Sequence, residues 1–460
     1  MFSSPLDSAS TPPPCPQIWT PQSACCFGSY DGSVAVSSDS ALPISAKDVD
    51  AAAKIVAQVA HQTPLELSQR LTDLTGLPVY LKREDLQTCR SFKVRGAYHK
   101  ISGLTQAERE AGVICASAGN HAQGVAYSCA HLGIHGTIFL PESTPKQKQG
   151  RIRSLGGQWV TLEFIEGVFD DTQNAALQRV EETGCTYVHP YDDPQVMAGQ
   201  GSLAKQLSEQ MPSDTKYVFI PVGGGGLISG MAVWLKENYP NLRIIGVESA
   251  GAACTYQALL AGSPQTLDYV DSFVDGTAVG RVGNNTFKVI SELVDQVVVV
   301  PEGAVCTEML DLYHLDGIIA EPAGALATTA IVMAAQNQLP ELVLDGMAIA
   351  IISGGNNDLS RYAEVLERSM VHRGLRHYFL VSFPQRPGAL RQFLDKVLGP
   401  NDDIISFEYM KKNNRETGPA LVGIDIQSQE DLAPLLARIE ASPLRIEQLD
   451  THAELLRFLV

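Results

Sequence analysis

The first 46 residues of this 460-residue chain contain no lysine, arginine or histidine and are rich in serine and proline. A secretory signal peptide needs a basic start and a transit peptide needs arginines, so the composition fits neither. Residues 1–46 are therefore expected to form a disordered N-terminal extension. The alternative is a gene start that has been placed too far upstream.

The nine cysteines include no CxxC pair and no metal-ligand spacing. This pattern predicts reduced thiols, no bound metal and a cytoplasmic location. The uncharged run at residues 217–235 is nominally long enough to cross a bilayer, but Pro221 and a run of glycines interrupt it, so a strand, loop and helix fit better. The net charge of −17 argues against nucleic acid or an anionic membrane as a partner.

From residue 47 to about residue 370, short β-rich runs alternate with helical patterns. The runs GVICAS, GTIFLP, KYVFIPV, RIIGVES and MAIAIIS are apolar, and segments such as HAQGVAYSCAHLG lie between them. Apolar strands bounded by glycine or proline and separated by helices are typical of parallel sheets that are covered on both faces. Residues 47–370 are therefore predicted to form an α/β domain.

The pattern changes near Arg376. HYFLVSF, DIISFEYM and PALVGIDI are expected to be strands, GALRQFLDKVL and DLAPLLARIEA helices, and a short last strand follows. This βαββαβ order is typical of small ferredoxin-like α+β modules. Residues 376–450 are therefore predicted to be a second domain, with EVLERSMVHRGL as the connector.

In SFKVRGAY, residues 91–98, a lysine stands between a phenylalanine and a valine at an expected loop-to-helix junction. Apolar surroundings disfavour the ammonium form of lysine, lower its pKa and favour Schiff-base chemistry. Lys93 is therefore the candidate catalytic residue.

Four consecutive glycines follow an apolar strand in PVGGGGLISG and open a helix. Without Cβ atoms, Gly223, Gly224, Gly225 and Gly226 let the backbone bend closely around an anion, and the helix N-terminus adds partial positive charge. No Lys-Ser/Thr pair follows and the spacing is not GxGxxG, so neither a nucleoside triphosphate nor a dinucleotide site fits. The alternative is a glycine turn that serves tight packing alone.

ASAGNHAQGVA, residues 116–126, also lies between a strand and a helix. Its small residues expose backbone N–H groups at a helix start, which suits a carboxylate, and Asn120 adds an amide. The candidate site for a substrate carboxylate consists of Ser117, Ala118, Gly119 and His121. Serine and asparagine are also ordinary helix caps, and a structural role is favoured for His121 taken alone.

Ser353 in IISGGNND stands at the carboxyl end of an apolar strand, where α/β sheets hold their ligands. Glu321 in AEPAGA is, taken alone, interpreted as a first-turn acid that complements a helix dipole. An amine, a phosphate cradle, an amide and a hydroxyl at βα turns together are what pyridoxal phosphate requires.

SFKVRGA, SAGNHAQG, GGGGL, EPAGA and SGGNND, in this order, resemble the motifs of threonine dehydratases (threonine ammonia-lyases). The resemblance implies the two-lobed, tryptophan synthase β-like fold of pyridoxal-phosphate enzymes, fold type II. It implies that Lys93 binds the cofactor aldehyde, Asn120 its phenolic oxygen and Ser353 its pyridine nitrogen. The implied phosphate site consists of Gly223, Gly224, Gly225, Gly226 and Leu227.

The C-terminal segment resembles the single ACT-like regulatory module of short biosynthetic threonine dehydratases. The resemblance implies conversion of L-threonine to 2-oxobutanoate and ammonia, the first committed step of isoleucine biosynthesis, with some activity on L-serine. It further implies inhibition by isoleucine, antagonism by valine and a homotetramer.

Three positions refine this resemblance. A neutral Ser353 opposite the pyridine nitrogen favours elimination over transamination. Related racemases carry a hydroxyl base at the position of Ala118, so little racemisation is expected. Cation-dependent relatives bind a metal after the strand that contains Glu248, but here Cys254 replaces a carboxylate, so no metal is expected.

Three other functions compete with this one. A degradative serine/threonine deaminase would use the same chemistry, but a regulatory module suits biosynthesis better. A non-catalytic amino-acid sensor would have no reason to keep Lys93. A dinucleotide-dependent oxidoreductase conflicts with the glycine spacing.

Overall fold

The computed structural model describes residues 41–409 and 415–449, and this part of the chain divides into two units after Gly374. Most of the predicted N-terminal extension, residues 1–40, lies outside the described residues. Ser45 caps helix α1 (Ala46–Val56), because its hydroxyl accepts a hydrogen bond from the backbone N–H of Asp48.

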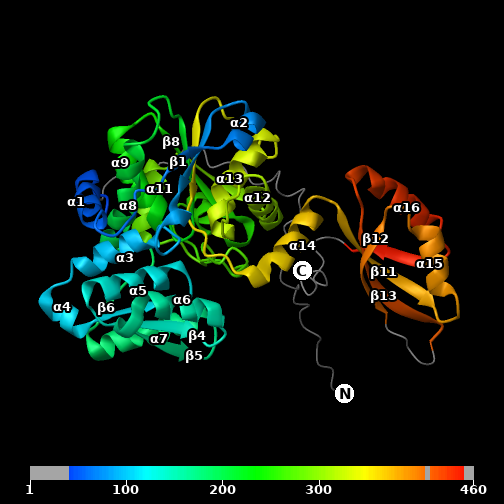
Figure 1. Cartoon of the computed structure of the whole chain (residues 1–460), viewed down its shortest axis with the longest axis horizontal. Coiled ribbons are helices and arrows are strands. Elements are labelled where there is room, and N and C mark those ends of the chain that lie inside the picture. Colours follow the sequence, from blue (N-terminus) through cyan, green and yellow to red (C-terminus); the bar gives the residue numbers. More distant parts are fainter. Residues whose placement is uncertain (1–40, 410–414, 450–460) are drawn as a thin grey trace, which may run out of the picture. The chain divides into compact units, whose positions relative to one another are not determined.

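The larger unit contains two sheets, each the centre of one lobe (Figure 1). The first sheet has the order β1 (Leu65–Leu67), β2 (Val79–Arg83), β10 (Ala348–Ile352), β7 (Tyr217–Pro221), β8 (Arg243–Ser249) and β9 (Gln296–Val300). Only β1 is antiparallel to its neighbour in this sheet. The second sheet is parallel throughout, with the order β5 (Val160–Ile165), β4 (Gly136–Pro141), β3 (Val113–Ala116) and β6 (Thr186–Tyr187).

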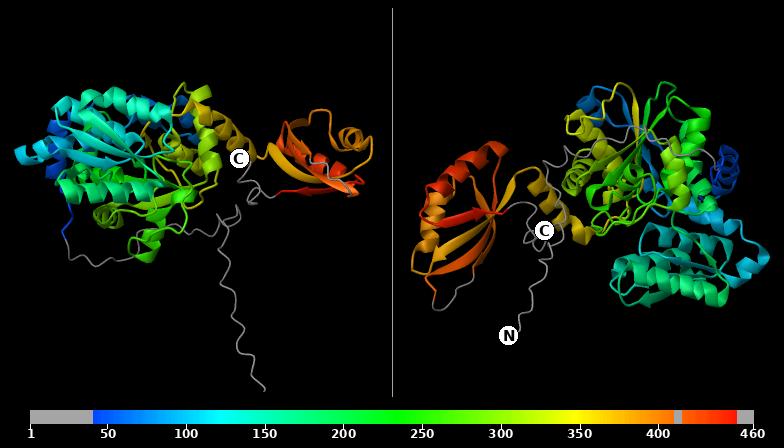
Figure 2. Two further views of the ribbon diagram at one scale, coloured as in Figure 1. Left: turned by 90° about the horizontal axis from the view of Figure 1, so that it is seen from below. Right: turned by 180° about the vertical axis from the view of Figure 1, so that it is seen from behind.

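Helices cover these sheets, as Figures 1 and 2 show. Besides α1 they are α2 (Gln69–Thr75), α3 (Lys93–Ser102), α4 (Gln106–Ala111), α5 (Asn120–Leu132), α6 (Lys146–Gly156), α7 (Phe169–Thr183), α8 (Pro194–Ser208), α9 (Gly226–Asn238), α10 (Cys254–Ala261), α11 (Asn284–Leu293), α12 (Glu302–His314), α13 (Pro322–Ala335) and α14 (Tyr362–His372). No helix within the described residues has the length and apolar character that crossing a membrane requires.

Burial explains why the central strands are apolar throughout. Every residue of β7 and β10 is buried. In the smaller lobe, different helices cover the two faces of β3. Val113 and Cys115 pack in one apolar cluster with residues of α5, whereas Ile114 and Ala116 pack with Ala176 of α7. A strand whose two faces are both covered has no polar face to alternate with, which confirms the predicted parallel α/β fold.

The C-terminal unit contains β11 (Arg376–Pro384), α15 (Ala389–Val397), β12 (Asp403–Tyr409), β13 (Thr417–Asp425), α16 (Leu432–Glu440) and β14 (Arg445–Gln448). Its four strands are antiparallel in the order β12-β13-β11-β14, and both helices contribute to one apolar cluster with the sheet. The predicted βαββαβ order of an α+β module is therefore confirmed.

Candidate active site

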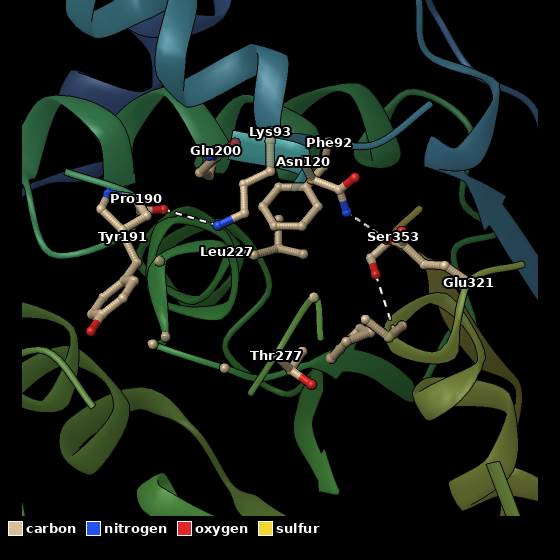
Figure 3. Close-up of a pocket in the computed structure, with 17 residues that line it drawn as sticks. Phe92, Lys93, Asn120, Pro190, Tyr191, Gln200, Leu227, Thr277, Glu321 and Ser353 are labelled. Atoms are coloured by element: carbon tan, nitrogen blue, oxygen red, sulfur yellow. Dashed lines mark hydrogen bonds between the residues drawn. The ribbon is translucent and has the colours of Figure 1, made fainter. Parts of the chain in front are cut away.

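One pocket in the larger unit is lined by every residue that the sequence assigned to cofactor binding (Figure 3). These residues are Lys93, Asn120, Gly223, Gly224, Gly225, Gly226, Leu227 and Ser353. They come from turns after β7 and β10 of the larger sheet and from the first residues of α3, α5 and α9. The carboxyl ends of parallel strands thus meet helix N-termini at this pocket, the usual location for ligands in α/β sheets.

Lys93 is the first residue of α3, and its side chain points into the pocket (Figure 3). The Nζ atom donates a hydrogen bond of 3.0 Å to the carbonyl oxygen of Pro190. Burial lowers the pKa of Lys93 to about 8, and the nearby negative charge of Glu321 opposes this shift only partly. A substantial neutral fraction of the amine therefore exists near pH 8, as attack on an aldehyde requires.

A second lysine with the same electrostatic property lies elsewhere. Burial also lowers the pKa of Lys82, on β2, to about 8. Its Nζ atom donates hydrogen bonds to the carbonyl oxygen of Thr63 at 2.6 Å and to Gln210 Oε1 at 2.7 Å. Lys82 does not line the pocket, so geometry distinguishes the two amines where the pKa does not.

The tetraglycine turn leaves no room for side chains. A Cβ atom on Gly224 would lie 2.3 Å from the ring of Tyr191, and one on Gly223 would lie 2.9 Å from the Cα atom of Thr277. Gly225 has φ +91°, a left-handed conformation that glycine adopts at no steric cost. Helix α9 begins at Gly226, so the turn forms a backbone cradle at the positive end of a 13-residue helix.

Asn120 and Ser353 line the same pocket as this cradle. The Ser353 side chain is buried, and its hydroxyl donates a hydrogen bond of 3.2 Å to the carbonyl oxygen of Ala323. The Asn120 amide donates to Glu321 Oε1 at 2.6 Å and accepts from Asn356 Nδ2 at 2.6 Å. Both polar groups are thus fixed in position by neighbours of the pocket.

Glu321 has a larger place in the site than its interpretation as a first-turn acid implied. It is the N-cap residue of α13, only 4% exposed, and it lines the pocket. Burial, with repulsion from Asp275, raises its pKa to about 7, although the hydrogen bond from Asn120 opposes the shift. A carboxyl group that titrates near neutrality next to a pocket is a feature of functional sites.

The predicted carboxylate site lies outside the set of residues that line the pocket. Ser117, Ala118, Gly119 and His121 are not among the residues that line it. The Ser117 hydroxyl accepts a hydrogen bond from the Gly119 N–H at 3.2 Å, which orders the turn before α5. The His121 ring is buried and donates from Nε2 to the carbonyl oxygen of Val188 at 2.8 Å, and burial lowers its pKa to about 3. His121 is therefore neutral and packed into the lobe.

Sequence reasoning gave no role to a further set of lining residues: Phe92, Pro190, Tyr191, Gln200, Pro221, Gly276, Thr277 and Ala323. Phe92, Pro221 and Ala323 stand within the motifs quoted above, whereas the others belong to no recognised motif. Glu321 had a usable signal, because an acid directly before a long apolar helix is costly to bury unless it has a partner. Gly276 and Thr277 had none, since only the tertiary fold brings their loop to the tetraglycine turn.

Glu248 and Cys254, the two positions considered above for a cation, interact with each other. The Glu248 carboxylate is buried and accepts backbone hydrogen bonds from Thr255 at 2.9 Å and Tyr256 at 2.8 Å, so it caps α10. The Cys254 Sγ atom lies 3.8 Å from Glu248 Oε1. Within the described ranges, no group of three or more histidine, cysteine, aspartate or glutamate side chains could hold a metal ion.

Comparison with protein families gives two matches. Residues 56–349 match the family described as pyridoxal-phosphate-dependent enzyme, and residues 367–460 match the C-terminal regulatory domain of threonine dehydratase. The first match covers the tetraglycine turn and the lysine-bearing helix. The second match covers the whole C-terminal unit.

Similar proteins span nearly the same length. The biosynthetic L-threonine dehydratase IlvA of Mycobacterium leprae is 53% identical over 420 residues, which are 91% of this chain and 97% of the relative. The Bacillus subtilis protein of that name is 46% identical over 417 residues, covering 91% and 98%. Among solved structures, threonine deaminase isoform 2 from Solanum lycopersicum is 40% identical with a TM-score of 0.66, covering 70% of this chain and 92% of that one. Maize serine racemase is 29% identical with a TM-score of 0.66, covering 72% and 99%.

Proposed function

Because the chain belongs to the pyridoxal-phosphate-dependent enzymes, and among them to the biosynthetic L-threonine dehydratases, we propose that it deaminates L-threonine to 2-oxobutanoate and ammonia. The observation that carries this proposal is the gathering of Lys93, the tetraglycine turn, Asn120 and Ser353 around one pocket. As in the relatives, the reaction would supply isoleucine biosynthesis, with L-serine as a secondary substrate.

The pocket fits pyridoxal phosphate on two independent observations. Side chains at positions 223 and 224 would collide with Thr277 and Tyr191, so only glycine lets the backbone pack this closely beside the pocket, as a backbone phosphate cradle requires. The Lys93 amine has a pKa of about 8, so it can react with an aldehyde at neutral to mildly basic pH. When bound, the cofactor supplies an electron sink that makes the Cα hydrogen of an amino acid acidic.

Each of the chain's own groups would then have a defined role. The Lys93 Nζ atom would hold the cofactor aldehyde, and the free amine would accept the Cα proton of threonine. Gly223 to Gly226 and Leu227 would hold the phosphate with backbone N–H groups at the start of α9. The Asn120 amide would orient the phenolic oxygen. The Ser353 hydroxyl would bind the pyridine nitrogen without a charge, and this neutrality would favour elimination of the β-hydroxyl over transamination.

The turn before α5 is proposed to receive the substrate carboxylate. Ser117, Ala118 and Gly119 precede Asn120, whose amide faces the pocket. Backbone N–H groups at a helix start suit an anion. Ala118 offers a methyl group where a racemase needs a proton carrier, so little racemisation is expected. His121, which follows this turn, is held by its hydrogen bond to the carbonyl oxygen of Val188.

The C-terminal unit is proposed to bind the controlling ligand. Its likeness to the regulatory domain of threonine dehydratase supports isoleucine as inhibitor, with valine as antagonist. Residues 47–370 are the proposed catalytic domain and residues 376–450 the regulatory one. A homotetramer in the cytoplasm remains the expectation.

Purified protein reconstituted with pyridoxal phosphate tests the proposal. Threonine should yield 2-oxobutanoate and ammonia in equal amounts, serine should react more slowly, and rising isoleucine should inhibit both. Lys93→Ala should lose turnover. Binding of amino acids without release of an oxo acid would instead support a sensor, and turnover that does not respond to isoleucine would support a degradative enzyme.

A further inference from the structure

One wall of the active-site pocket is a loop that connects α10 to α11 rather than a strand or helix. Gly276 and Thr277 of this loop line the pocket. A Cβ atom on Gly276 would lie 2.7 Å from the Cβ atom of Ala323, and the Thr277 backbone closes on Gly223 of the phosphate cradle. A displacement of this loop by an ångström would therefore change the shape of the pocket.

Two guanidinium groups stack on an aromatic ring of the same loop and hold it in place. Phe273 is 3% exposed, and the Cζ atoms of Arg361 and Arg368 lie 4.7 Å and 4.3 Å from its ring centroid. Arg361 also donates from Nη2 to the carbonyl oxygen of Phe273 at 2.7 Å. We call these three residues the arginine clasp. A planar guanidinium stacks on an aromatic face in a way that an ammonium group does not.

Ion pairs to Asp271 and Asp275, which flank Phe273 in the sequence, reinforce the clasp. Arg361 lies 3.8 Å from Asp275 Oδ1, and Arg368 lies 3.6 Å from Asp271 Oδ2. Glu364 contacts both arginines, at 3.8 Å and 3.0 Å. The loop is thus bound at both ends of the segment from Asp271 to Asp275, directly before Gly276.

The loop also has a tie to the opposite lobe. Lys148, on α6, forms an ion pair with Asp275 at 2.6 Å. Asp275 in turn contributes to the raised pKa of the pocket residue Glu321. A shift of the clasp would therefore change both the position of the pocket wall and the charge of Glu321 beside Asn120.

Both arginines of the clasp belong to the last elements before the C-terminal unit. Arg361 ends a short 3-10 turn (Leu359–Arg361), and Arg368 is on α14, which packs on α12 through a Thr307–Ser369 hydroxyl contact of 3.0 Å. Helix α14 ends at His372, and β11 of the C-terminal unit begins at Arg376. Only three residues separate the helix that carries Arg368 from the first strand of the unit that resembles a regulatory domain.

We propose that Arg361 and Arg368 are positioning residues for the pocket wall, and that ligand binding in the C-terminal unit reaches the active site by moving α14 and thereby the arginine clasp. This inference rests on the proposed function for its substrate and effector. It assigns the route of control to α14, which contacts the loop at residues 271–277 through Arg368 and is joined to the C-terminal unit through the chain.

Hydrogen exchange of the full-length holoenzyme gives a readout that does not depend on turnover. Addition of isoleucine is expected to change amide exchange in the peptide that covers residues 271–277, together with peptides of α14. Arg368→Gln should remove the change in the loop while isoleucine still binds by calorimetry. No isoleucine-dependent change at residues 271–277 in the unmodified protein would overturn the proposal.

Kinetics of the same variants supply the second test. Isoleucine should alter the KM for threonine by at least about fivefold in the unmodified protein, the lower range for coupled sites, and by less than about half of that factor in Arg368→Gln. Arg368→Lys, which keeps the charge and loses the planar stack, should restore part of the response. Arg243→Gln is the matched control, because Arg243 stacks on Tyr217 at 5.4 Å at the end of the sheet remote from the pocket.

The outcomes separate this proposal from the proposed function. A protein that forms no 2-oxobutanoate refutes the function, whereas the exchange experiment still decides whether the clasp responds to isoleucine. An Arg368→Gln variant that keeps the full effector response refutes the clasp and leaves the function intact. If Arg368→Gln fails to fold, Arg368→Lys and Arg361→Lys carry the same comparison.

Discussion

The buried carboxyl group of Glu321 predicts an unusual pH dependence of stability. Its folded pKa is raised from 4.5 to about 7, so the folded state binds a proton that the unfolded state releases. Stability from this group is fully present below pH 4.5 and is lost as the pH rises through about 7. At about 1.4 kcal/mol per pKa unit, the loss approaches about 3 kcal/mol.

Glu321→Gln removes the titration and keeps an oxygen that can accept the hydrogen bond from Asn120. The variant should therefore gain stability relative to the unmodified protein between pH 5 and pH 8, by about 3 kcal/mol or roughly 5 °C in Tm. Thermal unfolding followed by circular dichroism across this range, at one protein concentration and with saturating cofactor, measures the difference.

The control is Glu110→Gln, because Glu110 is exposed on α4, where its carboxylate accepts a hydrogen bond from Gln106. Its Tm should follow that of the unmodified protein at every pH. If the Glu321→Gln curve also runs parallel to that of the unmodified protein, the carboxyl group does not titrate near neutrality. The electrostatic description of the pocket would then be wrong.

Two further substitutions test the site and its support. Gly224→Ala should abolish retention of pyridoxal phosphate, since its Cβ atom would lie 2.3 Å from the Tyr191 ring, whereas the control Gly150→Ala, whose Cβ atom meets nothing within 4 Å, should retain it. Absorbance at the cofactor band after gel filtration measures the amount of bound cofactor. A fully loaded Gly224→Ala protein would contradict the proposed phosphate cradle. Glu84→Gln should lower the free energy of unfolding by about 3 kcal/mol or more, because Arg95, which Glu84 binds through Nε at 2.7 Å and Nη2 at 2.9 Å, would remain buried without its counter-charge. Urea denaturation checks this value, and a loss below about 0.5 kcal/mol would show that the ion pair is dispensable.

Local patterns made much of this protein predictable. Parallel strands that are covered on both faces must be apolar throughout, so runs such as β7 and β10 are visible in the sequence. The tetraglycine turn is visible for a similar reason, since a backbone cradle excludes every other residue type there. The βαββαβ order of the C-terminal unit is visible because the order of strand-like and helix-like runs changes near Arg376.

What escaped prediction depends on contacts between distant residues. Neither the six-strand order nor the proximity of Thr277 to Gly223 leaves a local trace. The two partners Glu321 and Asn120 are 201 residues apart in the sequence, so neither position alone indicates the other. The pKa alone does not identify the catalytic lysine either. Lys82 and Lys93 both have a pKa of about 8, and only Lys93 lines the pocket.

Reduction of the holoenzyme with borohydride, followed by proteolysis and mass mapping, tests the central claim most directly. The account predicts one pyridoxyl-modified peptide, modified at Lys93, and none after Lys93→Ala. Modification at Lys82 or at any other lysine, or a protein that carries no reducible cofactor, would contradict it.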